Sequence, residues 1–190
     1  MSRDIEIEAK SLIKEIEYEK LLLKYKNDYP PYTQVNYLLN PSDIPLNDTK
    51  LAIRIRVKDY IEFTTKINLD EGKLEINQKL SKEEFDGFIN KHIVPKGEVY
   101  NELISRKMCD PEKLEVFATL TTYRMDIKFD DHLLSIDKNE YLDVIDYEVE
   151  CETNSMAEAI KYLSDFLNKE NIPFERNTNS KLKRVKARLI

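Results

Sequence analysis

The sequence predicts an α+β fold in which an antiparallel sheet closes, or nearly closes, on itself and helices pack outside it. Many short segments alternate apolar with polar residues, which is the period of a β-strand. Short turns join these segments as hairpins, and two capping boxes, Ser81–Glu84 and Ser155–Glu158, mark helices between them. If the apolar strand faces turn outward onto the helices, the charged faces must line a common interior.

The segment Ile5–Lys10 shows this alternation most clearly. Its apolar residues share one face, and the other face carries Glu6, Glu8 and Lys10. An acidic series with the same period returns near residue 150, with Asp146, Glu148, Glu150 and Glu152. Between them lie basic strands that carry Arg54, Arg56 and Lys66. Some strands therefore present acids and others present bases.

For any single strand, a charged face is usually the solvated face of an antiparallel sheet. Solvated faces tend to mix the two signs of charge, whereas these strands separate them. Separation by sign is better explained if the faces converge on a site that holds metal ions and a polyanion together. Carboxylates are ligands for Mg²⁺ or Mn²⁺, and Arg and Lys bind phosphate oxygens.

The N-terminal half predicts a helix after the first strand and then a meander of strands. Ser11 is a candidate cap for a helix through about Lys26, which Pro30–Pro31 ends. Alternation and turn residues predict strands at about 32–39, 50–58, 60–68 and 73–79, with a turn at 40–43. The first capping box opens a helix at Ser81, and apolar spacing predicts another at about 97–107.

The C-terminal half predicts three more strands and two helical segments. Alternation covers Leu114–Lys128, a further strand begins at Leu133, and the acidic strand covers Asp143–Glu152. The second capping box opens a helix through about Asn168, which Pro173 stops. The tail from Asn179 is basic and weakly helical.

Composition indicates one domain over residues 1–190, since 41% of the residues are hydrophobic and no linker interrupts the chain. The net charge of −6 argues against broad nucleic-acid binding but allows a local basic pocket. We expect a soluble cytoplasmic protein that does not associate with membranes, because no signal peptide or membrane-spanning run is evident. Its two cysteines are then reduced thiols. The sequence does not distinguish a monomer from a homodimer.

These charged strands resemble the CYTH superfamily, the triphosphate tunnel metalloenzymes named for class IV adenylate cyclases and thiamine triphosphatases. The resemblance rests on six motifs in order along nearly the whole chain. They are Glu6-x-Glu8-x-Lys10, Arg54-x-Arg56, Thr64-x-Lys66, Arg124 with Asp137, Glu148-x-Glu150, and Ser180-Lys181. Two positions depart from the family pattern: Asn40 stands where an acid is common, and Asp143 stands where a glycine is common.

The resemblance implies a closed eight-stranded antiparallel barrel whose bore holds a triphosphate. It implies Mg²⁺ or Mn²⁺ ligands at Glu6, Glu8, Asp137, Glu148 and Glu150. It implies phosphate binding by Lys10, Arg54, Arg56, Lys66, Arg124 and Lys181. The residues expected to act in catalysis are Glu6, Glu8, Lys10, Lys66, Glu148 and Glu150. Glu75 is either a further acid of the bore or a solvated hairpin carboxylate, and Gln34, Asn36 and Tyr37 either line the tunnel mouth or, for Tyr37, pack in the core.

The expected activity is divalent-metal-dependent hydrolysis of the terminal phosphate of a small inorganic or organic triphosphate. With only 3 glycines and no P-loop pattern, charged side chains rather than a backbone cradle must bind the phosphates. Two alternatives stay open: an adenylate cyclase that uses the same tunnel, and a module that binds polyphosphate or a phosphorylated metabolite without turnover. Release of orthophosphate, release of pyrophosphate with cyclic AMP, and binding without release distinguish the three.

Overall fold

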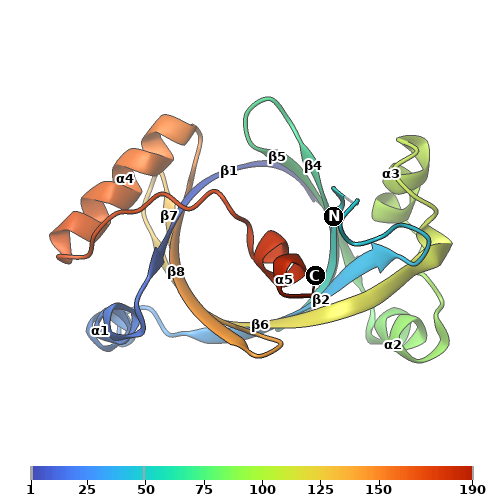
Figure 1. The fold of residues 1–190 in the computed structure, drawn as a ribbon, viewed down its shortest axis with the longest axis horizontal. Helices are drawn as coiled ribbons and strands as arrows, with labels where there is room; N and C mark the ends of the chain where they lie inside the picture. The colour runs from blue at the N-terminus through green and yellow to red at the C-terminus, as the bar shows by residue number, and fades with distance from the viewer. Residues whose placement is uncertain (1, 49, 190) are drawn as a thin grey trace.

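The protein is an antiparallel barrel of eight strands, seen in a computed structural model that describes residues 2–48 and 50–189 (Figure 1). The strands follow the order β1-β5-β4-β3-β2-β6-β7-β8, and β8 pairs back onto β1 to close the sheet. Their bounds are β1 (Ser2–Ile13), β2 (Tyr32–Pro41), β3 (Ala52–Val57), β4 (Ile61–Asn68), β5 (Lys73–Leu80), β6 (Leu114–Lys128), β7 (Leu133–Tyr141) and β8 (Val144–Thr153). The predicted closed barrel of eight strands is confirmed.

Two apolar clusters attach helices to the outside of the barrel (Figure 1). α1 (Glu15–Tyr25) and α4 (Met156–Lys169) pack on one side, where Leu21, Leu163 and Cys151 are fully buried. α2 (Lys82–Lys91) and α3 (Glu98–Ser105) pack on the other side, over Ile55 and Phe63. Burial of each leucine, isoleucine or phenylalanine side chain among them stabilises the fold by roughly 1.5–3 kcal/mol. Because the apolar faces are covered from outside, the charged faces point into the bore, as the alternation predicts.

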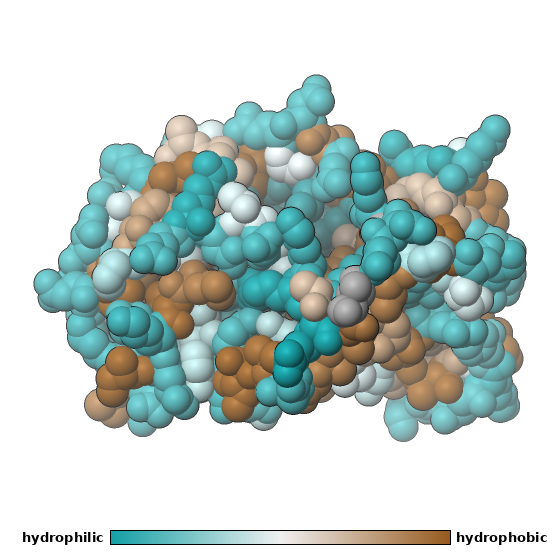
Figure 2. Space-filling view, viewed as in Figure 1, coloured by the Kyte–Doolittle hydropathy of each residue, from teal (hydrophilic) through white to brown (hydrophobic). Residues whose placement is uncertain are grey.

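The fifth helix, α5 (Lys181–Leu189), lies within the ring of strands when the barrel is viewed as in Figure 1. Its Leu182 and Val185 contact a third apolar cluster that includes Leu38, Leu120 and Tyr141. The basic tail predicted as weakly helical is thus a helix that covers part of the bore. Hydrophilic residues gather over the middle of the same face in Figure 2.

The predicted helix from Ser11 to Lys26 is wrong at its start. β1 continues to Ile13, and α1 begins at Glu15 after Lys14. The Ser11 hydroxyl accepts a hydrogen bond from the backbone N–H of Glu175, so a distant segment uses the group that would cap a helix. Pairing with β8 keeps this stretch extended, which local sequence signals do not report. Both predicted capping boxes do open helices, α2 and α4.

A 3₁₀ turn (Pro111–Lys113) precedes β6, and β6 has the predicted bounds. Within the described ranges, no helix combines the length and apolar character needed to cross a lipid bilayer.

Gly72, in the β4–β5 hairpin, packs closely against β1, the strand that carries Glu6. Its φ is +77°, and a Cβ there would lie 2.6 Å from the backbone oxygen of Glu6 and 2.8 Å from Cγ1 of Ile7. We expect Gly72→Ala to lower the free energy of unfolding by at least ~1 kcal/mol and to displace β1, because both the left-handed backbone and the close approach exclude a side chain. Urea unfolding measures the change.

Gly87→Ala is the matched control. Gly87 lies inside α2, and its nearest contact to an added Cβ is 4.0 Å away. Alanine favours a helix interior over glycine by up to ~1 kcal/mol, so this variant should be as stable as the parent or more so. Equal destabilisation by the two substitutions would contradict the role given to Gly72.

Candidate active site inside the barrel

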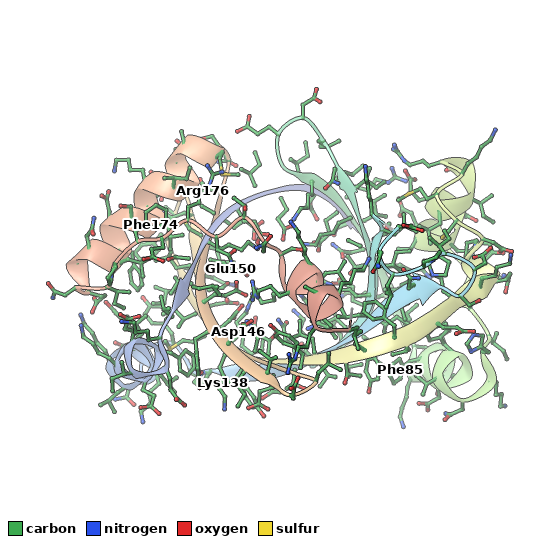
Figure 3. All side chains as sticks on the ribbon, in the orientation of Figure 1. Phe85, Lys138, Asp146, Glu150, Phe174 and Arg176 are labelled. Carbon is green, nitrogen blue, oxygen red and sulfur yellow. The ribbon has the colours of Figure 1, made fainter. Side chains whose placement is uncertain are left out.

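A cavity of about 910 Å³ occupies the bore and is lined by charged side chains from six strands and α5, with polar side chains from β2. The six cations implied by the resemblance all line it: Lys10, Arg54, Arg56, Lys66, Arg124 and Lys181. So do six acids, namely Asp4, Glu6, Glu8, Glu75, Glu150 and Glu152. Asp137 and Glu148 do not line the cavity, because they are fully buried in the wall behind Lys181 and Arg124. Figure 3 shows Glu150 and Asp146 inside the ring of strands, whereas Phe85 lies outside it.

On β3, Arg54 and Arg56 form a wall whose positive charge is only partly neutralised. Arg54 Nη2 lies 3.6 Å from Glu75, and its buried Nε has no hydrogen-bond partner among the described residues. Arg56 Nε donates to Asn36 at 3.0 Å, which is a neutral partner. Burial, together with Arg54 and Arg124, lowers the pKa of Arg56 to about 9. Since guanidinium stays protonated in proteins, this shift marks a buried positive charge that an anion would stabilise.

The lysines beside β1 hold the acids of the cavity in pairs. Lys10 Nζ contacts Glu8 at 2.7 Å and Glu150 at 2.9 Å. Lys66 Nζ binds Glu6 and lies 2.7 Å from Glu75. Glu75 is therefore a carboxylate of the bore, with a side chain 15% exposed, rather than a solvated hairpin residue. Burial by itself would raise its pKa, but Arg54 and Lys66 hold that pKa well below its usual range.

Three buried carboxylates converge on the ammonium of Lys181. Its Nζ lies 2.8 Å from Asp137, 2.6 Å from Glu148 and 2.8 Å from Glu150, whose oxygens lie within 4.8 Å of one another. Arg124 binds the same wall, with Nη2 2.6 Å from Asp137 and 2.7 Å from Glu150. Burial would raise the pKa of Glu150, but Lys10, Lys181 and Arg124 outweigh it and hold the pKa well below its usual range.

Glu152 forms a second acidic group with Glu6 and Glu8 at the mouth of the cavity. It is the pairing partner of Glu8 across β1 and β8, so the two side chains share the inner face. Although the residue reaches solvent, burial of its carboxylate and the neighbouring charges of Glu6 and Glu8 raise its pKa to about 7. Negative charge is thus in excess here, in contrast to the arginine wall.

The remaining polar residues fall on both sides of the sheet. Gln34 and Asn36 line the cavity, but Tyr37 packs outward, with its ring 5.2 Å from that of Phe85. Cys151 is fully buried among apolar residues, as its alternation with acids predicts.

Sequence analysis did not select Glu152 or Arg184 as site residues. Glu152 belongs to the same alternating series as Glu148 and Glu150, and that period could have identified it. Arg184 donates to Asp146 and Glu148 from α5. Its position three residues after Lys181, on the same helix face, was the available signal.

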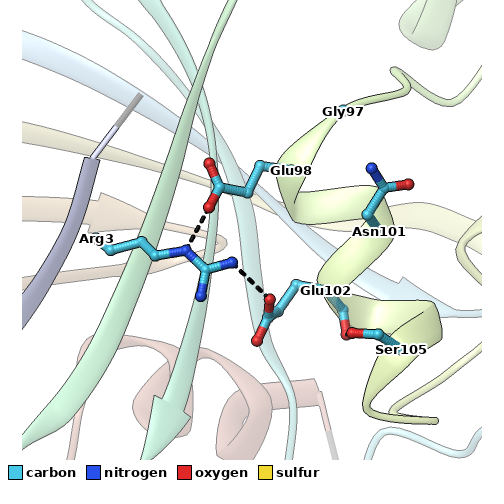
Figure 4. A pocket seen from close by; sticks show the side chains of 6 residues that line it. All are labelled: Arg3, Gly97, Glu98, Asn101, Glu102 and Ser105. Atoms are coloured by element: carbon cyan, nitrogen blue, oxygen red, sulfur yellow. Dashed lines mark hydrogen bonds and ion pairs between the residues drawn. The ribbon is translucent and has the colours of Figure 1, made fainter.

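A second hollow lies outside the barrel, between the start of β1 and α3 (Figure 4). There Arg3 Nη2 donates to Glu102 at 2.8 Å, and Arg3 Nε binds Glu98. The contact ties the beginning of β1, three residues before Glu6, to a helix packed on the barrel. It supports the strand that carries the first acids.

The fold and the site define a closed antiparallel barrel whose bore presents acids and bases on opposed walls, and proteins of this class are found by the comparisons with known proteins. The CYTH domain model matches residues 4–185. "Putative triphosphatase YjbK" of Bacillus subtilis is 30% identical over 188 residues, covering 97% of this chain and 95% of the relative. The chain belongs to the CYTH domain family.

Solved structures share the fold over nearly the full length. A "putative adenylate cyclase" from Bacillus halodurans superposes with a TM-score of 0.84 at 30% identity, covering 97% of this chain and 98% of the other. "Putative adenylyl cyclase HpAC1" from Hippeastrum, described as having a dominant triphosphatase activity, superposes with a TM-score of 0.80 at 20% identity, covering 96% of each chain. The second likeness concerns the fold alone.

Glu150 and Glu152 lie on the same strand and should respond in opposite directions to the same substitution. A low pKa stabilises the folded state above the usual titration range of a carboxyl group, so at pH 8 the contribution of Glu150 is fully present. A raised pKa has the opposite sign, so at pH 8 ionised Glu152 destabilises the fold. With metal ions chelated, we expect Glu150→Gln to lower the free energy of unfolding by roughly 3 kcal/mol and Glu152→Gln to raise it.

Urea unfolding of both variants at pH 8 with a chelator present tests this pair. A loss of stability in Glu152→Gln as large as that in Glu150→Gln would contradict the division into paired and unpaired acids.

Proposed function

We propose that this protein is a divalent-metal-dependent triphosphatase that hydrolyses the terminal phosphate of inorganic triphosphate inside the barrel. The observation that carries the proposal is the buried, only partly neutralised arginine wall facing acids across one cavity. A triphosphate brings about four negative charges. The arginine wall has too few acidic partners of its own, so these charges would neutralise it. The 30% identity to a protein named as a triphosphatase supports the same activity.

The cations divide into two roles. Arg54, Arg56 and Arg124 present planar guanidinium groups that suit bidentate binding of phosphate oxygens. Lys10, Lys66 and Lys181 present point charges beside the acids, where they neutralise charge that develops on the phosphate being released. The chain thus binds and orients the substrate entirely through side chains.

The donor set fits a divalent metal ion. Lys181 Nζ already occupies a position bounded by carboxylates of Asp137, Glu148 and Glu150, so this position accepts a cation. Lys181 must release these carboxylates before they can bind a metal, and it is then free to turn toward phosphate. Glu6, Glu8 and Glu152 offer a second group of hard oxygen ligands with excess negative charge. When bound, Mg²⁺ or Mn²⁺ supplies charge neutralisation and lowers the pKa of a bound water.

The cavity lining favours an inorganic over an organic triphosphate. None of the described residues that line it is aromatic, so no ring is available to stack on a nucleobase or a thiazolium. Such stacking contributes roughly 1–3 kcal/mol per base where it occurs. The cavity therefore recognises a substrate only through the charges of its phosphates.

We expect Glu8→Gln to reduce metal-dependent phosphate release by at least about a hundredfold, because it removes an acid from both the Lys10 pair and the proposed metal ligands. Orthophosphate release from tripolyphosphate with Mg²⁺ or Mn²⁺ measures the loss. Glu115→Gln is the control, since Glu115 also lies on a barrel strand but does not line the cavity. Full activity in correctly folded Glu8→Gln would refute the assigned role.

A substrate panel tests the preference for inorganic triphosphate. We expect kcat/KM for tripolyphosphate to exceed those for ATP and thiamine triphosphate by about tenfold or more, which corresponds to ~1.4 kcal/mol. Products identify the reaction: pyrophosphate with cyclic AMP from ATP would indicate a cyclase. A thermal shift with tripolyphosphate but no phosphate release would indicate a binding module.

A further inference from the structure

Arg184 makes more hydrogen bonds inside the barrel than any role in helix formation requires. Its Nε and Nη2 donate to the two oxygens of Asp146 at 2.8 and 3.0 Å. Its Nη1 and Nη2 donate to the two oxygens of Glu148, both at 3.0 Å. The side chain is only 12% exposed. One guanidinium therefore bridges two carboxylates of β8 in bidentate fashion, which a lysine ammonium cannot do.

The two carboxylates are themselves held from behind. Asn139 donates to both of them at 3.0 Å, and the Tyr141 hydroxyl donates to Asp146 at 2.7 Å. Arg184 thus binds a pair of carboxylates that other side chains of the barrel wall also hold in place. Neither Asn139 nor Tyr141 belongs to α5, so these bonds to the two carboxylates are made within the barrel wall itself.

Lys181 lies one helical turn before Arg184, on the same face of α5. Glu148 is bound by both residues, and Lys181 continues from it to Asp137 and Glu150. The apolar contacts of α5 come from Leu182 and Val185. Such contacts are non-directional, so they do not determine how far into the bore Lys181 extends.

We propose that Arg184 is a positioning residue that fixes the orientation of α5 on Asp146 and Glu148 and thereby holds Lys181 in the cavity. The inference rests on the proposed function, which assigns Lys181 to phosphate. When Lys181 leaves the carboxylates for the substrate, Arg184 keeps its bonds to Asp146, and the helix stays docked.

Arg188→Gln is the matched control for Arg184→Gln. Arg188 lies on the same helix and pairs with Asp143 at 2.7 Å, but both side chains are exposed, and exposed pairs contribute little. Calorimetry with Mg²⁺ and a non-hydrolysable triphosphate analogue measures binding without turnover, under the conditions in which Lys181 is proposed to leave its carboxylates. We expect Arg184→Gln to raise Kd about tenfold and Arg188→Gln to leave it within about twofold. Equal effects of the two substitutions would overturn the proposal.

A double-mutant cycle with Lys181→Gln tests whether Arg184 acts through Lys181. In the Lys181→Gln background, Arg184→Gln should change Kd by less than about twofold, because the group it positions is gone. An additive, tenfold further loss would overturn the proposal. Arg184→Lys should restore little of the affinity, since an ammonium lacks the planar donor array by which the guanidinium binds both oxygens of Asp146 and both oxygens of Glu148.

Hydrogen exchange separates failure of this inference from failure of the proposed function. Amides of residues 181–189 should exchange faster in Arg184→Gln than in Arg188→Gln, whatever the substrate is. Unchanged exchange would overturn the positioning role. If exchange accelerates but Lys181→Gln leaves Kd unaltered, the phosphate role of Lys181 fails and the docking role of Arg184 stands. Asp146→Asn, which leaves Arg184 in place, should reproduce the faster exchange, and protection equal to the parent's would contradict the proposal.

Discussion

Mutual neutralisation of acids and bases inside a closed sheet is the interaction on which this structure depends. Burying a charge without a partner is costly, so each wall of the bore is tolerated only because the other faces it. Lys10, Lys66, Arg124 and Lys181 each contact two or more carboxylates. Neutralisation is incomplete at two places, the arginine wall at Arg56 and the acids around Glu152. A ligand of opposite charge would stabilise the protein most at these two places.

The same pairing explains how one cavity could hold both of the proposed ligands, a metal ion and a polyanion, although their charges are opposite. Lysines bind the carboxylates that a metal ion would need, and those carboxylates bind the cations that phosphate would need. A cation and a polyanion that arrive together can exchange partners with both sets at once. Either ligand alone would leave buried charges uncompensated, so binding of the two should be mutually favourable.

The outer helices and α5 play different parts in this arrangement. α1–α4 cover apolar strand faces, which forces the alternating charged residues inward. α5 instead enters the ring and brings cations that no strand provides, among them Lys181 and Arg184. The bore is therefore built from nearly the whole chain, from Glu6 on the first strand to Arg184 on the last helix.

By itself the sequence determined the alternation of acids and bases, the capping boxes and most strand bounds, because these follow from local period and local hydrogen bonding. The motif order also indicated the family, the closed barrel and the residues that meet in the bore. Only the tertiary structure decided that Ser11 stays in a strand, that Asp137 and Glu148 lie behind the cavity rather than on it, and that α5 enters the ring. Those outcomes depend on contacts between separate elements, across 164 residues for Ser11 and Glu175, and short-range patterns carry no information about such contacts.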